Sequence, residues 1–469
     1  MSLKFKGFGF KHVIEIISIV LGIFLATRPG NESLSAEAFK ILGITLWGVT
    51  NFALGLAPFY ATGLLMCALW FVSGAVPAGT IFSGFAGTTF WLIIGCMNLA
   101  AAVKKSGLLK RLTLLCLKYF KPTYGGQIIA IILVGTLISP LIPATVAKVA
   151  IMGGLVYDIS EELELPKRGI GRFGMLLALW LGFNISGNYF LSGAFQAYMV
   201  KSAMPPESQA VYTWMTWFIR SLPWSITMIV LYYLFIRFFF NEKSYKEITK
   251  DYIVNKLKAL GDFSRDEKVT VVVMVCALIS FMLERVTGIS SMVTALVAMS
   301  VLNFFKVLTA KEFINDTAWH LVIFYGIALG MGAVFSSVGI TEWLVSTASP
   351  YMQGLSNPYL FVTVLCAMIY VVRIFLDQIT TNTMVVGIVV PFATALGFDP
   401  FVAAVVVYGC SVVFYPMYVH PTMLVALGTL GGEENVDMGK APLADVAYMV
   451  VNWLGFLACV PLWKLFGMC

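Results

Sequence analysis

The stretch "RIFLDQITTNTMVVGIVVPF", residues 373–392, interrupts a strongly apolar part of the sequence with polar side chains. It joins the runs "NPYLFVTVLCAMIYVV" and "VVGIVVPFATALGF". Its middle, residues 377–383, holds an aspartate, a glutamine, three threonines and an asparagine. Hydrocarbon gives such side chains no hydrogen-bonding partners, so they must lie where other protein groups or water can reach them. The stretch therefore predicts an interruption in a membrane-embedded segment.

The composition indicates a helical protein that crosses a membrane many times. Of 469 residues, 59% are hydrophobic and only 12% are charged, and the mean hydropathy is +0.88. A soluble domain carries about 25% charged residues. Apolar windows of roughly 17–25 residues, the length that crosses a bilayer, recur along the chain. We expect about eleven spans, at residues 12–27, 38–55, 58–76, 86–103, 171–203 (broken), 214–238, 269–284, 289–305, 318–344, 399–430 (broken) and 443–467.

The net charge of +7 would suggest nucleic acid in a soluble protein, but here the basic residues gather in alternate loops. The run "KKSGLLKR" at 104–111 and the basic linker 241–268 belong to one set of loops, whereas loops 29–37 and 346–358 hold no Lys or Arg. Such an asymmetry marks the cytoplasmic side. We therefore expect a multi-pass protein of the plasma (inner) membrane, surrounded by lipid, with a cytoplasmic N-terminus and no nucleic-acid partner.

Two further apolar stretches, residues 125–157 and 358–396, each contain a proline- or threonine-rich interruption near the middle. If each stretch crossed the membrane once, the basic loops downstream would fall on the wrong side. If each enters, turns and leaves on the same side, every basic loop stays cytoplasmic. The charge pattern therefore favours two re-entrant hairpins, the first opening inward and the second outward.

The two halves of the sequence also resemble each other. The segment "WLIIGCMNLAAAVKKSGLLKRL" (91–112) is similar to "HLVIFYGIALGMGAVFSSVGITEWL" (320–344). In both, a Gly is followed by Ala-Val and then by a Gly and a branched aliphatic residue, and each segment precedes one hairpin. This pattern predicts the inverted repeats of secondary transporters.

Two hairpin tips that meet inside the membrane would suit a small anion. They offer unpaired backbone N–H groups, hydroxyls and helix N-terminal dipoles. The run "TTNT" at 380–383 has three hydroxyl and two amide hydrogens to donate to carboxylate oxygens. The alternative is that the threonines bond back to helix carbonyls and that Asn382 only caps a helix.

The chain resembles the divalent anion:sodium symporter family, which includes dicarboxylate, citrate and sulfate carriers, over nearly its whole length. The resemblance rests on "TTFWLIIGCMNLAAAVKKSGLLKRL", "WMTWFIRSLPWSI", "DFSRDEKVTVVVMVCALISF" and "AWHLVIFYGIALGMGAVFSSVGITEWL", in that order. The family carries a Ser-Asn-Thr tip on each hairpin, and Thr381-Asn382-Thr383 matches the second tip. The resemblance implies that the tips bind the carboxylates of a substrate and help to hold sodium.

The first tip departs from the family pattern. In "LISPLIPATVAKVAIMGG", residues 137–154, the pattern falls on Ser139 and then on Pro143-Ala144-Thr145, or one residue later on Ala144-Thr145-Val146. Neither register keeps the asparagine. Lys148 follows Thr145 by three residues. An intramembrane lysine is a functional candidate, and it is open whether Lys148 binds the anion or pairs with a carboxylate.

The broken helices depart from the family as well. "NISGNYFLSGAF" keeps Gly187 and Gly193 of the first family loop but not its prolines, and "FYPMYVHPTMLVALG" places His420 where the second loop is expected. His420 is equally compatible with a packed neutral imidazole. The residues expected to bind the anion are Thr381, Asn382, Thr383, Thr145, Ala144, Pro143, Lys148, His420, Pro421 and Thr422. Those expected at a cation or proton site are Ser139, Gly187, Asp377, Thr380, Asn382 and Tyr418, with Na+ held at Asp377 and Asn382.

The coupling mechanism stays open. Asp377 stands where the family has Ser or Thr, so it could strengthen a sodium site, carry a proton, or pair with Lys148 or Arg373. Sodium symport, proton coupling and anion exchange are all compatible with the sequence. Apart from Na+ as a coupling ion, no cofactor is expected.

We therefore expect an all-α transporter of the elevator type rather than an enzyme. The three histidines, at 12, 320 and 420, are far apart, and neither a HExxH nor a Gly-x-Ser-x-Gly motif occurs. A channel would need a repeated filter sequence or rings of charge. The expected substrate is a C4-dicarboxylate such as succinate or malate, with sulfate, 2-oxoglutarate, citrate or a sulfonate as alternatives. The resemblance implies a homodimer, with scaffold regions at 1–120 and 269–350, transport regions at 121–240 and 351–469, and a cytoplasmic linker at 241–268.

Overall fold

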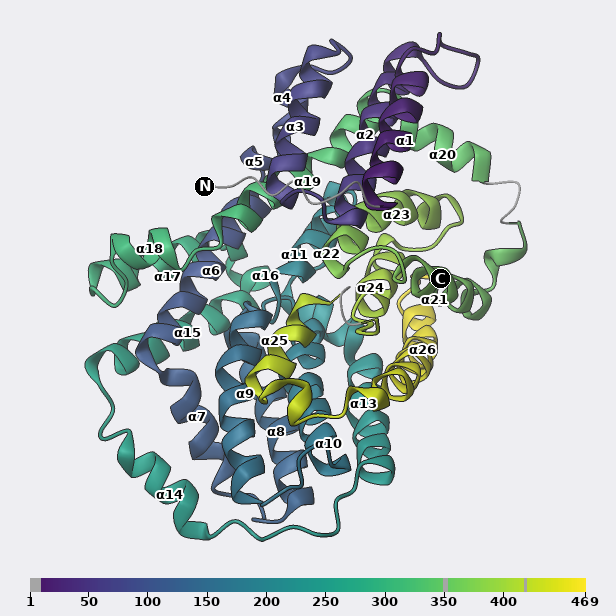
Figure 1. Cartoon of the computed structure of the whole chain (residues 1–469). Helices are drawn as coiled ribbons and strands as arrows, with labels where there is room; N and C mark the ends of the chain where they lie inside the picture. Colours follow the sequence, from purple (N-terminus) through teal and green to yellow (C-terminus); the bar gives the residue numbers. More distant parts are fainter. Residues whose placement is uncertain (1–9, 349–352, 417–419) are drawn as a thin grey trace, which may run out of the picture.

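The computed structural model describes residues 10–348, 353–416 and 420–469, which form helices and connecting segments without a β-strand (Figure 1). Each predicted span contains at least one helix, so the all-α prediction is confirmed. The N-terminal helices are α1 (Phe10–Ala26), α2 (Ala36–Leu54), α3 (Phe59–Val72), α4 (Ala78–Ile81), α5 (Ser83–Ala86), α6 (Thr88–Ser106) and α7 (Leu108–Leu117).

The first predicted hairpin consists of α8 (Tyr124–Ile138), a 3-10 turn (Ser139–Leu141) and α9 (Thr145–Glu162). Both arms pack against α7 and against the following helix α10, so the chain turns back at the interruption instead of continuing. The elements that follow are α10 (Ile170–Leu179), a π-helical turn (Trp180–Asn184), a 3-10 turn (Ile185–Tyr189), α11 (Phe195–Ser202), α12 (Pro206–Val211) and α13 (Trp214–Phe239).

The second half begins after a short linker helix. Like the first half, it contains a hairpin followed by a broken helix and a long helix. In Figure 1 the first hairpin lies in the lower half of the molecule and the helices of the second hairpin lie higher. The linker and the next helices are α14 (Lys250–Ala259), α15 (Arg265–Met282), α16 (Glu284–Thr287), α17 (Ser291–Phe304), α18 (Ala310–Asn315), α19 (Trp319–Ser337) and α20 (Ile340–Ala348). The second hairpin and the last helices are α21 (Pro358–Val372), α22 (Gln378–Thr380), a π-helical turn (Thr381–Val385), α23 (Val386–Ala395), α24 (Pro400–Cys410), α25 (Pro421–Thr429) and α26 (Ala441–Leu465).

Two glycines mark the same bend in each half. Gly107, between α6 and α7, has φ 75°, and Gly339, between α19 and α20, has φ 76°. This left-handed conformation ends a helix and strongly favours glycine. The two residues are the final glycines of the similar segments 91–112 and 320–344. The sequence similarity therefore reflects equivalent backbone geometry, and the span predicted at 318–344 is two helices rather than one.

Six helices among the described residues are long and apolar enough to cross a membrane, or seven if α6 and α7, bent by 68°, form one span. Four shorter apolar helices, of 10–17 residues, are α3, α17, α21 and α24. Fewer helices than predicted spans therefore reach full length, because several spans are broken and others, such as α3 and α17, are short.

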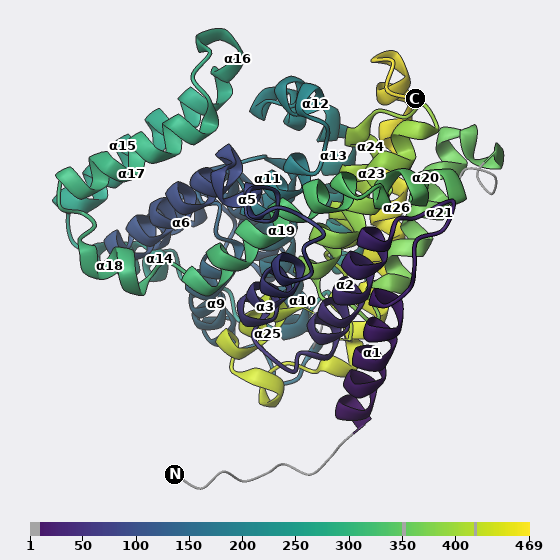
Figure 2. The ribbon, with the colours of Figure 1, turned by 90° about the horizontal axis from the view of Figure 1, so that it is seen from above.

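The long helices α13 and α26, one from each half, pack against each other. The Trp224 indole N–H donates to the Asn452 side-chain oxygen at 2.7 Å, and the Tyr232 hydroxyl donates to the Ala444 carbonyl at 3.1 Å. The rings of Trp224 and Phe456 stack with centroids 4.8 Å apart. Seen from above, α15–α18 lie at one side of the molecule and α1 lies at the opposite side (Figure 2).

The first hairpin approaches the broken helix so closely that it requires glycine. A Cβ on Gly135 in α8 would lie 2.4 Å from the carbonyl carbon and oxygen of Gly182. On Gly154 in α9 a Cβ would meet no atom within 4 Å.

We predict opposite effects for two alanine substitutions in this hairpin. Gly135→Ala should destabilise the fold by about 1–3 kcal/mol because backbone must move to admit the methyl group. Gly154→Ala should be neutral or stabilise by up to about 1 kcal/mol, because alanine favours helix over glycine. Tryptophan-fluorescence unfolding in detergent measures both; equal unfolding temperatures for the two variants would contradict the close contact.

Candidate substrate and cation site

The first hairpin tip is fastened to the break between α10 and α11. The Ser192 hydroxyl donates to the Pro140 carbonyl at 2.6 Å, and the Phe195 amide donates to the Pro143 carbonyl at 3.1 Å. Both bonds join segments about 50 residues apart in sequence. Ser192, Pro140 and Pro143 lie outside the α-helices, and Phe195 is the first residue of α11, where the amide has no partner within the helix. Tip and break therefore act as one structural unit.

Lys148 lies inside this unit. Its side chain is completely buried, and Nζ donates to the Ser139 hydroxyl oxygen at 3.2 Å and to the Gly193 carbonyl at 2.8 Å. Gly187 is also adjacent, because a Cβ built there would lie 3.0 Å from Nζ. Ser139 and Gly187 are two residues predicted to hold a cation. The structure places the ammonium of Lys148 beside both.

No carboxylate among the described residues forms an ion pair with Lys148. A buried ammonium without a paired anion costs several kcal/mol, which neutral oxygens offset only in part. The pairing of Lys148 with Asp377 across the tips, one of the alternatives from sequence, is therefore absent from the part of the chain that the structure describes.

The polar run of the second hairpin is arranged as a helix start. Asp377 caps α22: its carboxylate accepts from the amides of Ile379 and Thr380, at 2.7 and 3.1 Å, and from the Thr380 hydroxyl at 2.6 Å. The hydroxyl of Thr381 donates to the Asp377 carbonyl at 2.8 Å, and that of Thr383 donates to the Ile379 carbonyl at 3.0 Å.

These bonds correct one expectation from the sequence. All three hydroxyl hydrogens of residues 380–383 are donated within the chain, so they do not point at a substrate in this structure. A threonine on a helix readily bonds to the carbonyl one turn earlier, and this local bond wins here. The hydroxyl oxygens keep lone pairs, so Thr381 and Thr383 can accept hydrogen bonds or contact a cation.

Asn382 and His420 differ from the threonines because their polar atoms have no hydrogen-bond partner among the described residues. Asn382 is 1% exposed and His420 is fully buried. Leaving such groups unpaired costs free energy. The Asn382 amide therefore has two hydrogens free to bind an incoming carboxylate and an oxygen free to bind its counter-ion.

A cavity of about 680 Å³ reaches the second tip. Asn382 and Thr383 line it, together with Gln209, Ser336 and Thr394. Its size is typical of small-molecule sites, and its lining residues carry no formal charge. The cavity lies between α19, α11–α12 and α23, so a small polar solute could reach the tip there.

The remaining predicted residues are placed as follows. His420 begins α25 beside Trp180, with ring centroids 4.6 Å apart, and Thr422 is buried while Pro421 is exposed. Thr145 is buried at the start of α9, next to Ala144. Tyr418 lies outside the described residues. The lining of the cavity includes Asn382 and Thr383 but not the first-tip residues or His420, so the structure does not bring all predicted ligands into one space.

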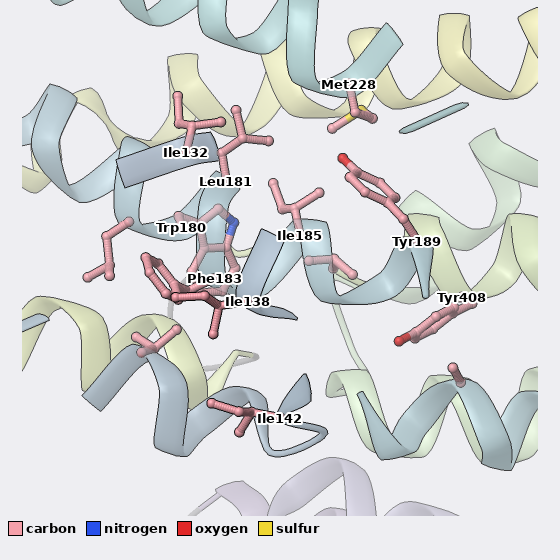
Figure 3. Close-up of a cluster of buried hydrophobic side chains, with 14 of the residues drawn as sticks. Ile132, Ile138, Ile142, Trp180, Leu181, Phe183, Ile185, Tyr189, Met228 and Tyr408 are labelled. Atoms are coloured by element: carbon pink, nitrogen blue, oxygen red, sulfur yellow. The ribbon is translucent and has the colours of Figure 1, made fainter. Parts of the chain in front are cut away.

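The surroundings of the break are apolar. Ile138, Trp180 and Phe183 lie together in Figure 3, and Trp180 and Phe183 are fully buried. A low-dielectric surrounding strengthens every electrostatic interaction of the nearby Lys148.

Sequence reasoning missed Asp445, a buried carboxylate in α26 that accepts from the amides of Phe414 and Tyr415 at 3.0 and 3.3 Å. An aspartate inside the apolar run 441–465 was a detectable signal, because intramembrane carboxylates are usually functional. Arg373, which the sequence offers as a partner of Asp377, has a fully buried side chain and donates to the carbonyls of Leu376 and Val413.

The unpartnered amide of Asn382 leads to a prediction that separates binding from stability. Asn382→Ala should weaken binding of a small dicarboxylate by about tenfold or more while leaving the unfolding temperature unchanged, because no internal bond is lost. Asn452→Ala should instead destabilise the protein by about 1–3 kcal/mol, because its amide is bonded to Trp224 and Tyr370. Ligand-induced shifts in unfolding temperature measure both effects. Unchanged binding by the Asn382 variant would exclude this amide as a ligand.

Known transporters are similar to this chain over most of its length. The model of the sodium:sulfate symporter transmembrane region matches residues 10–434. Dicarboxylate transporter 2 of spinach (Spinacia oleracea) chloroplasts is 23% identical over 384 residues, which cover 79% of this chain and 68% of that protein. The sodium-dependent dicarboxylate transporter SdcS of Staphylococcus saprophyticus is 25% identical over 417 residues, covering 82% of this chain and 79% of its own. The citrate/succinate antiporter of Escherichia coli is 22% identical over 312 residues, covering 64% and 63%.

A solved structure shares the fold. The YdaH transporter of Alcanivorax borkumensis superposes with a TM-score of 0.55 over 83% of this chain and 88% of that chain, at 13% sequence identity. At this identity the likeness concerns the fold alone. The family match covers most of the chain, so the protein belongs to the divalent anion:sodium symporter family and is an integral membrane transporter of divalent anions.

Proposed function

We propose that this protein transports a C4-dicarboxylate such as succinate or malate by exchanging it for another dicarboxylate, without a requirement for sodium. Names of its relatives support this substrate class: one is called a sodium-dependent dicarboxylate transporter and another a citrate/succinate antiporter. The unpartnered amide of Asn382 beside the cavity supports an anion site at the second tip.

The single observation that carries exchange is the position of Lys148. Its ammonium contacts Ser139 and Gly193 and lies beside Gly187, in the place where a coupling cation was expected. A sodium ion dissociates after each crossing, whereas the charge of a lysine side chain stays with the empty carrier. An empty carrier would then have to move an uncompensated ammonium through the membrane, which is unfavourable. A bound dianion removes this penalty, so the loaded carrier crosses and the empty one does not.

The movement itself is proposed to be of the elevator type. On this proposal residues 1–120 and 269–350 form a fixed scaffold in a homodimer, while 121–240 and 351–469 carry the substrate. The cavity between α19 of the scaffold and the second hairpin of the transport part supports this division. The protein is placed in the plasma membrane with a cytoplasmic N-terminus, as the basic loops indicate.

Sodium symport is the second candidate. It is favoured by the part-buried carboxylate of Asp377 and the hydroxyl oxygens of Thr380 and Thr381 beside it, which are suitable sodium ligands. In that case Lys148 would replace only one of two coupling ions.

Uptake by proteoliposomes distinguishes the two candidates. With potassium as the only alkali cation, labelled succinate should enter vesicles loaded with unlabelled succinate and should not enter empty vesicles. Lys148→Met should lower this exchange by about tenfold or more, because the dianion loses its charge partner. Lys110→Met, at an exposed position on α7, is the matched control and should exchange like wild type. Uptake into empty vesicles driven by a sodium gradient would overturn exchange in favour of symport.

A further inference from the structure

The break between α24 and α25 is held by two buried charges that share one peptide group. Arg373, at the end of α21, donates from Nη2 to the Val413 carbonyl at 2.8 Å. Asp445, near the start of α26, accepts from the Phe414 amide at 3.0 Å. The carbonyl of residue 413 and the amide of residue 414 belong to the same peptide plane. The guanidinium of Arg373 therefore binds the oxygen of this peptide group, and the carboxylate of Asp445 binds its hydrogen.

Both charges are removed from water. Arg373 is fully buried and Asp445 is 2% exposed. Asp445 also accepts from the Tyr415 amide at 3.3 Å, and Arg373 also donates to the Leu376 carbonyl, just before the second tip. The guanidinium thus connects the hairpin to the break, and the carboxylate connects the break to α26. Hydrogen bonds in such a chain polarise one another in a low-dielectric interior.

The first half holds its break in a related way but with one difference. There the hairpin cation is Lys148, which donates to the Gly193 carbonyl at the same distance of 2.8 Å. In each half, a cation carried by the hairpin donates to a carbonyl in the break that follows. The second half adds a carboxylate on the other side of the peptide, whereas the ion pairs of the described residues give Lys148 no such counterpart.

We propose that Arg373 and Asp445 are positioning residues that act as a charge pair through the 413–414 peptide and so fix the break between α24 and α25 against the second hairpin. This inference rests on the proposed function, in which Lys148 is the uncompensated charge of the first half. Because Asp445 balances Arg373, Lys148 is left as the fixed charge that the substrate must neutralise.

The test is a double-mutant cycle on dicarboxylate exchange in proteoliposomes. Arg373→Gln and Asp445→Asn should each lower the maximal exchange rate by about tenfold or more, because each leaves the other charge buried and unbalanced. The double variant should lose no more than the weaker single variant. Arg285→Gln, at an exposed position on α16, is the control and should match wild type. Losses that multiply in the double variant would overturn the charge pair.

Chemical rescue tests the charge separately from the shape of the site. Arg373→Ala should recover exchange when millimolar guanidinium chloride is added, because the added cation can restore the charge opposite Asp445. Arg373→Lys, which keeps the charge, should retain more activity than Arg373→Gln. A variant that stays folded, as shown by its unfolding temperature, but does not respond to guanidinium would contradict a charge role for Arg373.

The cycle is run in buffers with and without sodium, so that the two proposals fail in different ways. If wild type exchanges only in sodium, the proposed sodium-free function is wrong. The coupling between Arg373 and Asp445 is then still measured in the sodium buffer, and its absence there would reject the charge pair independently.

Discussion

The buried ammonium of Lys148, which donates to neutral oxygens, is the interaction on which the arrangement of the first hairpin and the neighbouring break depends. It joins the hairpin, through Ser139, to the break of the following helix, through Gly193. Gly187 packs against the same contact, because a Cβ there would lie 2.9 Å from the Gly193 carbonyl oxygen and 3.0 Å from Nζ. A fixed positive charge at this depth is unfavourable unless an anion accompanies it. The same contact therefore explains the local structure and the proposed need for a bound dianion.

The two halves share one order of elements but bind their breaks with different charged side chains. Each half has a helix that ends at a left-handed glycine, then a hairpin, a broken helix and a long final helix. In the first half the break consists of π and 3-10 turns followed by a segment in which Gly193 accepts from lysine. In the second half the 413–414 peptide of the break is bonded to arginine and aspartate. Broken helices free backbone groups from helical bonding, and these freed groups bind the buried charges.

The sequence predicted the elements well because their signals are local. The spans and both hairpins could be located from apolar length, alternate basic loops and interrupted runs. The equivalent bends could be located from the repeated Gly-aliphatic pairs at Gly107 and Gly339. The interactions of the site were harder. Lys148 and Gly193 are 45 residues apart, and Arg373 and Val413 are 40 apart, so their contacts depend on how helices pack. The threonine hydroxyls of the second tip were expected to face a substrate, but a bond to the preceding turn decided their direction.

A structure determined with succinate in sodium chloride tests the central claim most directly. In that structure Nζ of Lys148 should remain within hydrogen-bonding distance of the Gly193 carbonyl, and the space between Ser139 and Gly187 should hold no separate ion. The dicarboxylate should contact the amide of Asn382. A sodium ion between Ser139 and Gly187, with Lys148 turned away, would contradict the central claim.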